Sequence, residues 1–264
     1  MNAPDAPVLL QRHGAIAEIQ LNRPPAMNAA NRELAEAFLV ACKAIAADQS
    51  VRAVLLRGAG KAFMSGGDLA GFHADPDHGE QIANSLIEPL NAAVAILADL
   101  PAPVVASLHG AVAGAGVSLA LACDLAIAAD NVKFNLAYAR IGASPDVSAS
   151  WTLPRVVGLR KAMEIALLAD NFDAAEALRL GIVNRVVPAA DLATETDALM
   201  QRLANGPTLS YGAIKKLLRA SSERGLREQM EAERLAFVGC ANTADFREGV
   251  AAFYEKRPAR FSGA

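Results

Sequence analysis

Apolar residues first follow the short spacing of β-strands and then the longer spacing of a helix. Two apolar runs, 8–11 and 15–21, flank His13-Gly14 and predict a hairpin of two strands. After Asn31, apolar residues recur every three or four positions. This spacing predicts a helix that is capped by Asn31 and ends near Ala47.

The middle of the chain alternates short apolar runs with stretches of helical spacing. The predicted strands are 52–57, 103–108, 124–129 and 182–187. The predicted helices are 79–99, 148–168 with a break at Gly158, and 173–180. A glycine-rich turn at 110–116 is expected to continue as a further helix to about residue 123. Strands that alternate with helices are typical of crossover connections in a largely parallel sheet. The fold class predicted from this pattern is therefore α/β.

From about residue 192 the chain shows only amphipathic helical segments. They are broken at Gly206-Pro207, Gly225 and Asn242. This change divides the chain into a core over 1–191 and a helical region over 192–264. The apolar faces of these last helices must be buried, either on the core or on another subunit.

Composition narrows the class of protein. The chain has 264 residues, of which 53% are hydrophobic and 20% charged, so a disordered chain is excluded. The formal net charge of −3 gives no basic surface of the kind that binds nucleic acid. The longest apolar stretch, 111–129, is interrupted by glycines and Asp124, and we expect no membrane-spanning segment.

Other features predict a cytoplasmic protein without a metal site. The N-terminal residues lack the basic region and apolar block of a secretion signal. Three widely separated cysteines suit a reducing compartment. The histidines have no partners at metal-binding spacing, so we expect no bound metal.

Two glycine-rich loops carry the candidate chemistry. In KAFMSGGDL, residues 61–69, the N–H of Gly67 is placed to donate to an oxygen, although an ordinary turn with Asp68 capping the next helix is an alternative. In HGAVAGAGVS, residues 109–118, small side chains leave the start of a helix uncovered. Its N–H groups can stabilise a negative oxygen, although close packing on the sheet is an alternative.

Several motifs together give a family resemblance. They are LNRP at 21–24, RGAGKAFMSGGDL at 57–69, VASLHGAVAGAGVSLALACDL at 105–125, PRVVGLRKAMEIALL, ALRLGIVNRVVP and FREGVAAFYEKR. In this order the chain resembles the enoyl-CoA hydratase/isomerase, or crotonase, superfamily over nearly its whole length. The resemblance implies a crotonase-like spiral of ββα units and a C-terminal helical trimerisation region. It also implies an acyl-CoA thioester substrate, no separate cofactor because CoA is part of that substrate, and a homotrimer or a dimer of trimers.

The resemblance also assigns site residues by position. The N–H groups of Gly67 and Ala115 match the pair that holds the thioester oxygen in the family, which more often has Gly at the second position. The positions expected near CoA or the acyl group are Ala26, Met64, Ser65, Asp68, Ser118 and Tyr138, together with Phe253 and Lys256 near the C-terminus, which can reach CoA across subunits.

The reaction type depends on the acidic residues. Hydratases of the family use two glutamates, and this chain has Ser118 and Tyr138 at those positions. Neither side chain is a good acid or base near pH 7. Asp146 instead matches the acidic residue of the dienoyl-CoA and ring-epoxyphenylacetyl-CoA isomerases. A single carboxylate suffices to move a proton along an allylic system, so Asp146 is the predicted proton carrier, unless it only caps the helix that begins near Ser148.

Three other functions compete with an isomerase. A hydratase could use Asp146 alone or with another acid. A dehalogenase would use the same aspartate as a nucleophile, but the histidine expected on the preceding helix is replaced by Ala95. The fourth hypothesis is a catalytically silent acyl-CoA-binding paralogue.

Overall fold

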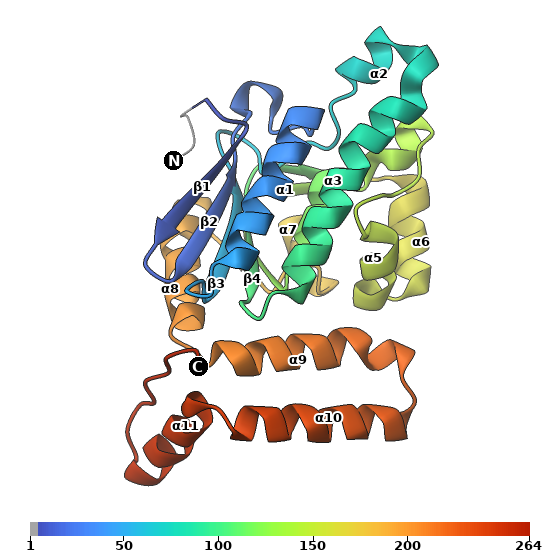
Figure 1. Ribbon diagram of the computed structural model, residues 1–264. Helices are drawn as coiled ribbons and strands as arrows, with labels where there is room; N and C mark the ends of the chain where they lie inside the picture. Colours follow the sequence, from blue (N-terminus) through green and yellow to red (C-terminus); the bar gives the residue numbers. More distant parts are fainter. Residues whose placement is uncertain (1–4) are drawn as a thin grey trace.

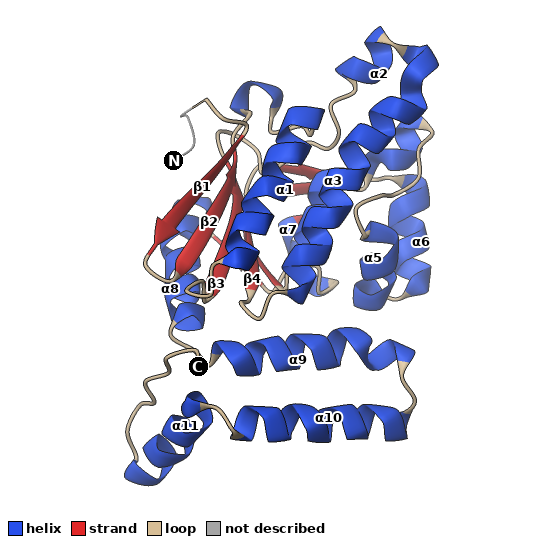
Figure 2. Ribbon diagram, in the orientation of Figure 1, coloured by secondary structure: helices blue, strands red, loops and turns tan. Residues whose placement is uncertain are grey.

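The computed structural model describes residues 5–264 and contains a main sheet of six strands (Figures 1 and 2). The strands, in spatial order, are β1 Val8–His13, β2 Ile16–Leu21, β3 Ala53–Gly58, β4 Val104–Leu108, β6 Leu125–Ala129 and β9 Arg185–Val187. β1 and β2 form the predicted antiparallel hairpin, and every other neighbouring pair is parallel. Residues 1–4, at the start of the predicted core and of the segment expected to carry no secretion signal, lie outside the described residues.

A second sheet was not predicted from the sequence. It consists of β5 Ala111–Ala113, β7 Lys133–Asn135 and β8 Phe172–Asp173. Residues 111–113 were expected to belong to the turn into the next helix, and this expectation was wrong. Strands of two or three residues are too short for apolar periodicity to reveal, because their positions are set by pairing partners elsewhere in the chain.

The core also contains helices, and the long helices that follow β2 and precede β4 lie side by side over one face of the main sheet (Figure 1). The core helices are α1 Arg32–Ala47, α2 Ala70–Ala74, α3 Gly79–Asp99, α4 Ala115–Ala122, α5 Ala149–Val157, α6 Leu159–Leu168 and α7 Ala174–Arg179. The Asn31 side chain caps α1 as predicted, because its Oδ1 accepts from the N–H of Leu34 at 3.0 Å. Residues 76–99 are long and apolar enough to cross a membrane, but here α3 packs beside α1 (Figure 1).

The C-terminal helices differ in what they contact. They are α8 Leu192–Ala204, α9 Thr208–Ala220, α10 Leu226–Ala241 and α11 Ala244–Glu255. α8 packs on the sheet face opposite α1, where Met200 meets Leu55 while the next residue, Leu56, points into the main core. α9, α10 and α11 lie beyond one end of the body (Figure 1). The region 192–264 therefore contains one helix that covers the sheet and three that project from it.

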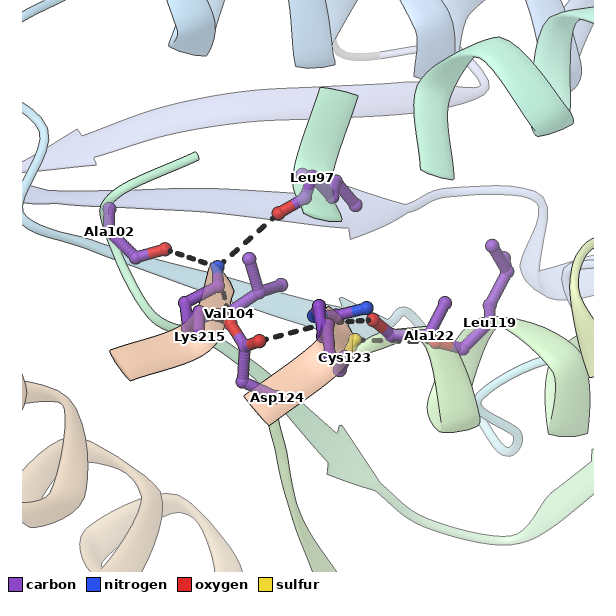
Figure 3. Close-up of polar contacts among 9 residues, drawn as sticks. Leu97, Ala102, Val104, Leu119, Ala122, Cys123, Asp124 and Lys215 are labelled. Carbon is purple, nitrogen blue, oxygen red and sulfur yellow. Dashed lines mark hydrogen bonds and ion pairs between the residues drawn. The ribbon is translucent and has the colours of Figure 1, made fainter. Parts of the chain in front are cut away.

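A buried ion cluster joins α9 to the body (Figure 3). Asp124, between α4 and β6, has Oδ2 at 2.6 Å from Nζ of Lys215 and Oδ1 at 2.9 Å from the guanidinium of Arg219. Lys215 also donates to the carbonyl of Ala102 at 3.0 Å, and the N–H of Val104 donates to Oδ2 of Asp124 at 2.8 Å. Each charged atom has a partner, which makes the burial of Lys215 tolerable.

Candidate active site

A cavity of about 710 Å³ lies between the two glycine-rich loops, α3 and the segment before α5. Its apolar wall comes from one face of α3 and from Phe72 of α2. Its polar wall comes from the backbone at Gly67 and Ala115 and from the side chains of Tyr138 and Asp146. An apolar cavity with a few converging polar groups is the usual form of a small-molecule site.

The first glycine-rich loop is held in place by Asn28, which the sequence analysis did not single out. Asn28 is fully buried, and its Nδ2 donates at 2.8 Å to the carbonyls of both Ala59 and Ala62. Its backbone has a φ of 57°, a left-handed conformation that asparagine tolerates better than most residues. The segment that follows LNRP therefore supports the loop through the buried side-chain amide of Asn28.

Gly67 lines the cavity. The N–H of Ala30 donates to the carbonyl of Gly66 at 2.8 Å, and the N–H of Asp68 donates to the carbonyl of Ala30 at 2.8 Å. These two bonds use the groups on either side of Gly67. Within residues 5–264 the N–H of Gly67 itself has no acceptor, and a Cβ on Gly67 would meet nothing within 4 Å.

Ala115 lines the same cavity. Ala115 is the first residue of α4, so its N–H has no intrahelical acceptor and carries part of the positive end of the helix dipole. The preceding Gly114 has φ 49° and ψ −120°, a conformation that other residues rarely adopt. A Cβ on Gly114 would lie 3.4 Å from the Cα of Gly66, so the two loops touch where their N–H groups line the cavity.

α4 can lie on the first loop only because residue 116 is glycine. A Cβ there would be 2.4 Å from the carbonyl oxygen of Met64. The backbone of Met64 is bonded to β5, since its N–H donates to Ala111 at 3.2 Å and its carbonyl accepts from Ala113 at 2.9 Å. The Met64 side chain is buried in the main core, so this residue positions the loop and its side chain does not line the cavity.

Asp146 belongs to a row of hydrogen-bonded side chains. The hydroxyl of Tyr138 donates to Oδ1 of Asp146, and Oγ of Ser118 lies 3.0 Å from the same hydroxyl. The side chain of Asp146 does not cap α5; only its backbone carbonyl accepts from the N–H of Ala149, at 3.1 Å. The capping alternative raised for Asp146 is therefore wrong, because its carboxylate is turned toward Tyr138 and the cavity.

Local backbone strain accompanies this orientation. Val147 and Ser148 follow Asp146 with φ values of 49° and 69°. A left-handed conformation is unusual for a β-branched residue, and such strain costs about 1–3 kcal/mol for each residue. The Val147 side chain is buried, and this burial compensates for the strain of its backbone.

Burial shifts both acidic groups of this row in the same direction. It raises the pKa of Asp146 above its ordinary value, and the hydrogen bond from Tyr138 opposes part of that rise. The pKa of Tyr138 is also raised, by burial and then by the charge of Asp146, so Tyr138 remains a neutral donor. A carboxyl whose pKa is raised is better matched to proton transfer near neutral pH.

The structure brings some of the other predicted site residues to the cavity. Ser65 lines it, and Oγ of Ser65 donates to the carbonyl of Ala26 at 3.4 Å. Ser118 is fully buried behind Tyr138 and does not line the cavity. Asp68 lies outside the cavity lining, 3.1 Å from the guanidinium of Arg23.

Two predicted residues are remote from this cavity. Figure 1 shows α11 beyond α9, away from α2 and α3, which border the cavity. Phe253 near the end of α11 is 79% exposed, and Lys256 follows the helix as its C-cap. Within one chain these residues therefore do not join the cavity.

His73 lines the cavity but was not among the predicted site residues. It lies on α2, directly after Phe72, and no motif or spacing marked it. Within residues 5–264, no group of three or more His, Cys, Asp or Glu side chains could hold a metal ion. The titratable side chains lining the cavity in this part of the chain are His73, Tyr138 and Asp146.

These features define a class of site: two main-chain N–H groups without an internal acceptor in the described part of the chain and one carboxylate line an apolar cavity of an α/β protein. The family model described as "Enoyl-CoA hydratase/isomerase" matches residues 11–264. The chain therefore belongs to the enoyl-CoA hydratase/isomerase family and has the crotonase fold.

Individual relatives agree with this membership. The chain is 40% identical to a "Probable enoyl-CoA hydratase" of Rhodobacter capsulatus over 94% of this chain and 95% of that protein. It is 37% identical to the "1,2-epoxyphenylacetyl-CoA isomerase" of Escherichia coli over 93% of this chain and 94% of that protein. The crystal structure of an enoyl-CoA hydratase from Polaromonas sp. JS666 superposes with a TM-score of 0.91 at 31% identity, covering 96% of this chain and 99% of the other.

Proposed function

We propose that this enzyme moves the double bond of an enoyl-CoA thioester between the C3–C4 and C2–C3 positions. Asp146 removes a proton from C2 of the 3-enoyl thioester, which forms a dienolate. The N–H groups of Gly67 and Ala115 hold the dienolate oxygen. Protonated Asp146 then returns the proton to C4, so no atom is gained or lost.

The observation that carries this proposal is the single carboxylate in the cavity. Among the described residues, Asp146 is the one Asp or Glu side chain in the lining. The two positions that carry glutamates in hydratases are Ser118 and Tyr138, and both are hydrogen-bonded in one row with Asp146. One proton carrier suffices when a proton leaves and returns to the same substrate. Hydration instead needs one group to remove a proton from water and an acid to protonate the α-carbon of the substrate.

The energetics are consistent with enolate chemistry. An α-proton of a thioester is too weakly acidic for a carboxylate unless the enolate is stabilised. One well-placed main-chain or amide donor is worth about 2.7–4 kcal/mol in such sites. The apolar wall from α3 lowers the effective dielectric constant around both donors, which strengthens their interaction with a negative oxygen.

Hydration is the second candidate. Relatives named as probable enoyl-CoA hydratases support it, and so does His73, which could act as the second proton carrier in the cavity. In that case Asp146 and His73 would divide the roles of base and acid. The two candidates therefore differ in whether His73 is needed.

Incubation of the purified protein with a 3-enoyl-CoA and a 2-enoyl-CoA separates the candidates. Isomerisation converts the 3-enoyl thioester into a conjugated product of the same mass, and the ultraviolet absorbance rises. Hydration of the 2-enoyl thioester lowers that absorbance and adds the mass of one water. Tight binding of both thioesters without turnover would identify a silent paralogue and overturn both candidates.

Two variants complete the experiment. Asp146→Asn should stop the isomerisation while titration calorimetry still detects acyl-CoA binding. His73→Gln should leave the isomerisation in place, because a single carrier suffices. Retained turnover in Asp146→Asn contradicts the proposed role of Asp146, and loss of turnover in His73→Gln favours hydration or a two-carrier mechanism.

We also propose that the C-terminal helices join copies of the chain into a trimer or a dimer of trimers. These helices expose large apolar side chains: Leu218, Leu226, Leu235, Phe237, Phe253 and Tyr254. A neighbouring copy would bury them and could bring Phe253 and Lys256 to the CoA of another subunit. Sedimentation equilibrium tests this, and a monomer at micromolar concentration would contradict it.

A further inference from the structure

A continuous row of hydrogen bonds links the carboxylate of Asp146 to the backbone of α4. It runs from Asp146 to the hydroxyl of Tyr138, then to Oγ of Ser118 at 3.0 Å, and then to the carbonyl oxygen of Gly114 at 3.4 Å. Ser118 is fully buried and Tyr138 nearly so. Both hydroxyls therefore find their partners within the protein rather than in bulk water.

Each hydroxyl has one proton to donate. Which group donates and which accepts along the row therefore depends on whether Asp146 is protonated. When Asp146 is ionised it can only accept, and Tyr138 must donate to it. Tyr138 then accepts from Ser118, which weakens the bond from Ser118 to Gly114. When Asp146 is protonated it can donate to Tyr138, Tyr138 can donate to Ser118, and the hydroxyl of Ser118 is free to donate to the carbonyl of Gly114.

The carbonyl of Gly114 belongs to the peptide group whose N–H is that of Ala115. Donation to this carbonyl withdraws electron density from the amide and makes its N–H a stronger donor, by about 10–30% for each bond in a cooperative chain. The N–H groups of Val117 and Ser118 already donate to the same carbonyl, at 2.9 and 3.2 Å. These backbone bonds do not change with the protonation of Asp146. The bond from the hydroxyl of Ser118 therefore accounts for the change in polarisation of this peptide group.

We propose that Tyr138 and Ser118 are positioning residues that couple the protonation of Asp146 to the strength of the Ala115 N–H. This inference rests on the proposed function. When Asp146 takes the substrate proton, the row reverses and Ala115 binds the newly formed enolate oxygen more strongly. When Asp146 returns the proton, the hydrogen bonds resume their first direction and the N–H of Ala115 binds the product oxygen less strongly.

The carbonyl band of a bound, saturated acyl-CoA tests this coupling without turnover. Butyryl-CoA labelled with carbon-13 at the thioester carbonyl is bound to the enzyme, and isotope-edited infrared spectra are recorded as the pH is lowered through the pKa of Asp146. The band should move to lower wavenumber as Asp146 becomes protonated. In Asp146→Asn the band should stay constant over the same range.

Ser118→Ala and Tyr138→Phe separate the row from a direct effect of the Asp146 charge on the ligand. Each variant removes one hydroxyl, and alanine favours the helix at position 118, so both should fold. The pH-dependent shift of the band should be smaller in each variant than in the original protein. An unchanged shift in Ser118→Ala would overturn the coupling.

His73 is another ionisable side chain in the cavity lining, and His73→Gln is the matched control. The shift should persist in His73→Gln, and its loss there would overturn the assignment to Asp146. Turnover adds a second readout. Ser118→Ala should lower kcat by about 2- to 10-fold and leave the dissociation constant of butyryl-CoA unchanged.

The pH profile of kcat/KM adds a third readout. Removal of the Tyr138 hydroxyl takes a hydrogen-bond donor away from the ionised form of Asp146, so the pKa of Asp146 should rise. In Tyr138→Phe the acidic limb should therefore move to higher pH by about one to two units. A shift to lower pH, or none, would contradict the row.

The outcomes distinguish this inference from the proposed function. Turnover retained by Asp146→Asn removes the proposed function, whatever the infrared band does. A band shift that survives in Ser118→Ala removes the coupling, while the loss of turnover in Asp146→Asn still stands.

Discussion

Asp124 and Asp146 are both partly or wholly removed from solvent, yet their surroundings differ in kind. Asp124 faces two cations, Lys215 and Arg219, and accepts from the N–H of Val104 (Figure 3). Asp146 faces only the hydroxyl of Tyr138 and a cavity, and burial raises its pKa. A carboxylate that contacts two cations ties distant segments of the chain together. A carboxylate beside neutral partners can take and release a proton.

The largest expected difference between the two aspartates is in turnover. Asp146→Asn should lower kcat by about 10²- to 10⁴-fold, the usual contribution of a general acid–base group. Steady-state kinetics with a 3-enoyl-CoA measures this loss. Calorimetric binding of the same thioester should change little, and loss of binding together with turnover would indicate a folding defect instead.

Asp124→Asn should show the opposite behaviour. Removing one partner from a buried pair leaves Lys215 with an uncompensated charge, so the free energy of unfolding should fall by about 3–5 kcal/mol. Urea denaturation followed by circular dichroism measures this loss. At low temperature the remaining folded enzyme should keep its kcat, and a stability equal to that of the original protein would show that the cluster is not an anchor.

The donor at Ala115 can be removed without touching either aspartate. Proline lacks the N–H and is well tolerated at the first position of a helix, which Ala115 occupies. Ala115→Pro should lower kcat by about 10²- to 10³-fold, as for the loss of one oxyanion donor. Ala115→Ser keeps the N–H and serves as the matched control, so equal losses in both variants would contradict the role of the N–H.

The smallest effect is on stability and depends on pH. The folded state binds the Asp146 proton more tightly than the unfolded state, so this group lowers the stability as pH rises from its unfolded pKa through its folded pKa. Above that window, the free energy of unfolding of Asp146→Asn should be higher than that of the original protein by about 0.5–2 kcal/mol, the usual gain from a single stabilising substitution. Urea denaturation measures this difference. Below that window, where Asp146 is neutral in both states, the difference should disappear.

Much of the fold could be predicted because its signals are local. The β1–β2 hairpin follows from two apolar runs that flank His13-Gly14, and α1 begins directly after Asn31 because that side chain caps the helix. The short strands β5, β7 and β8 could not be predicted, because their pairing is decided by residues far along the chain.

The sequence by itself determined the glycine-rich loops with Gly67 and Ala115, and it singled out Asp146 as the candidate acid. Only the tertiary structure decided that Tyr138 donates to Asp146, that Asn28 holds the first loop and that His73 lines the cavity. It alone also showed that Lys215 is buried against Asp124. The reason is physical: capping, turns and periodicity act over a few residues, whereas burial and side-chain pairing depend on which distant segments the fold brings together.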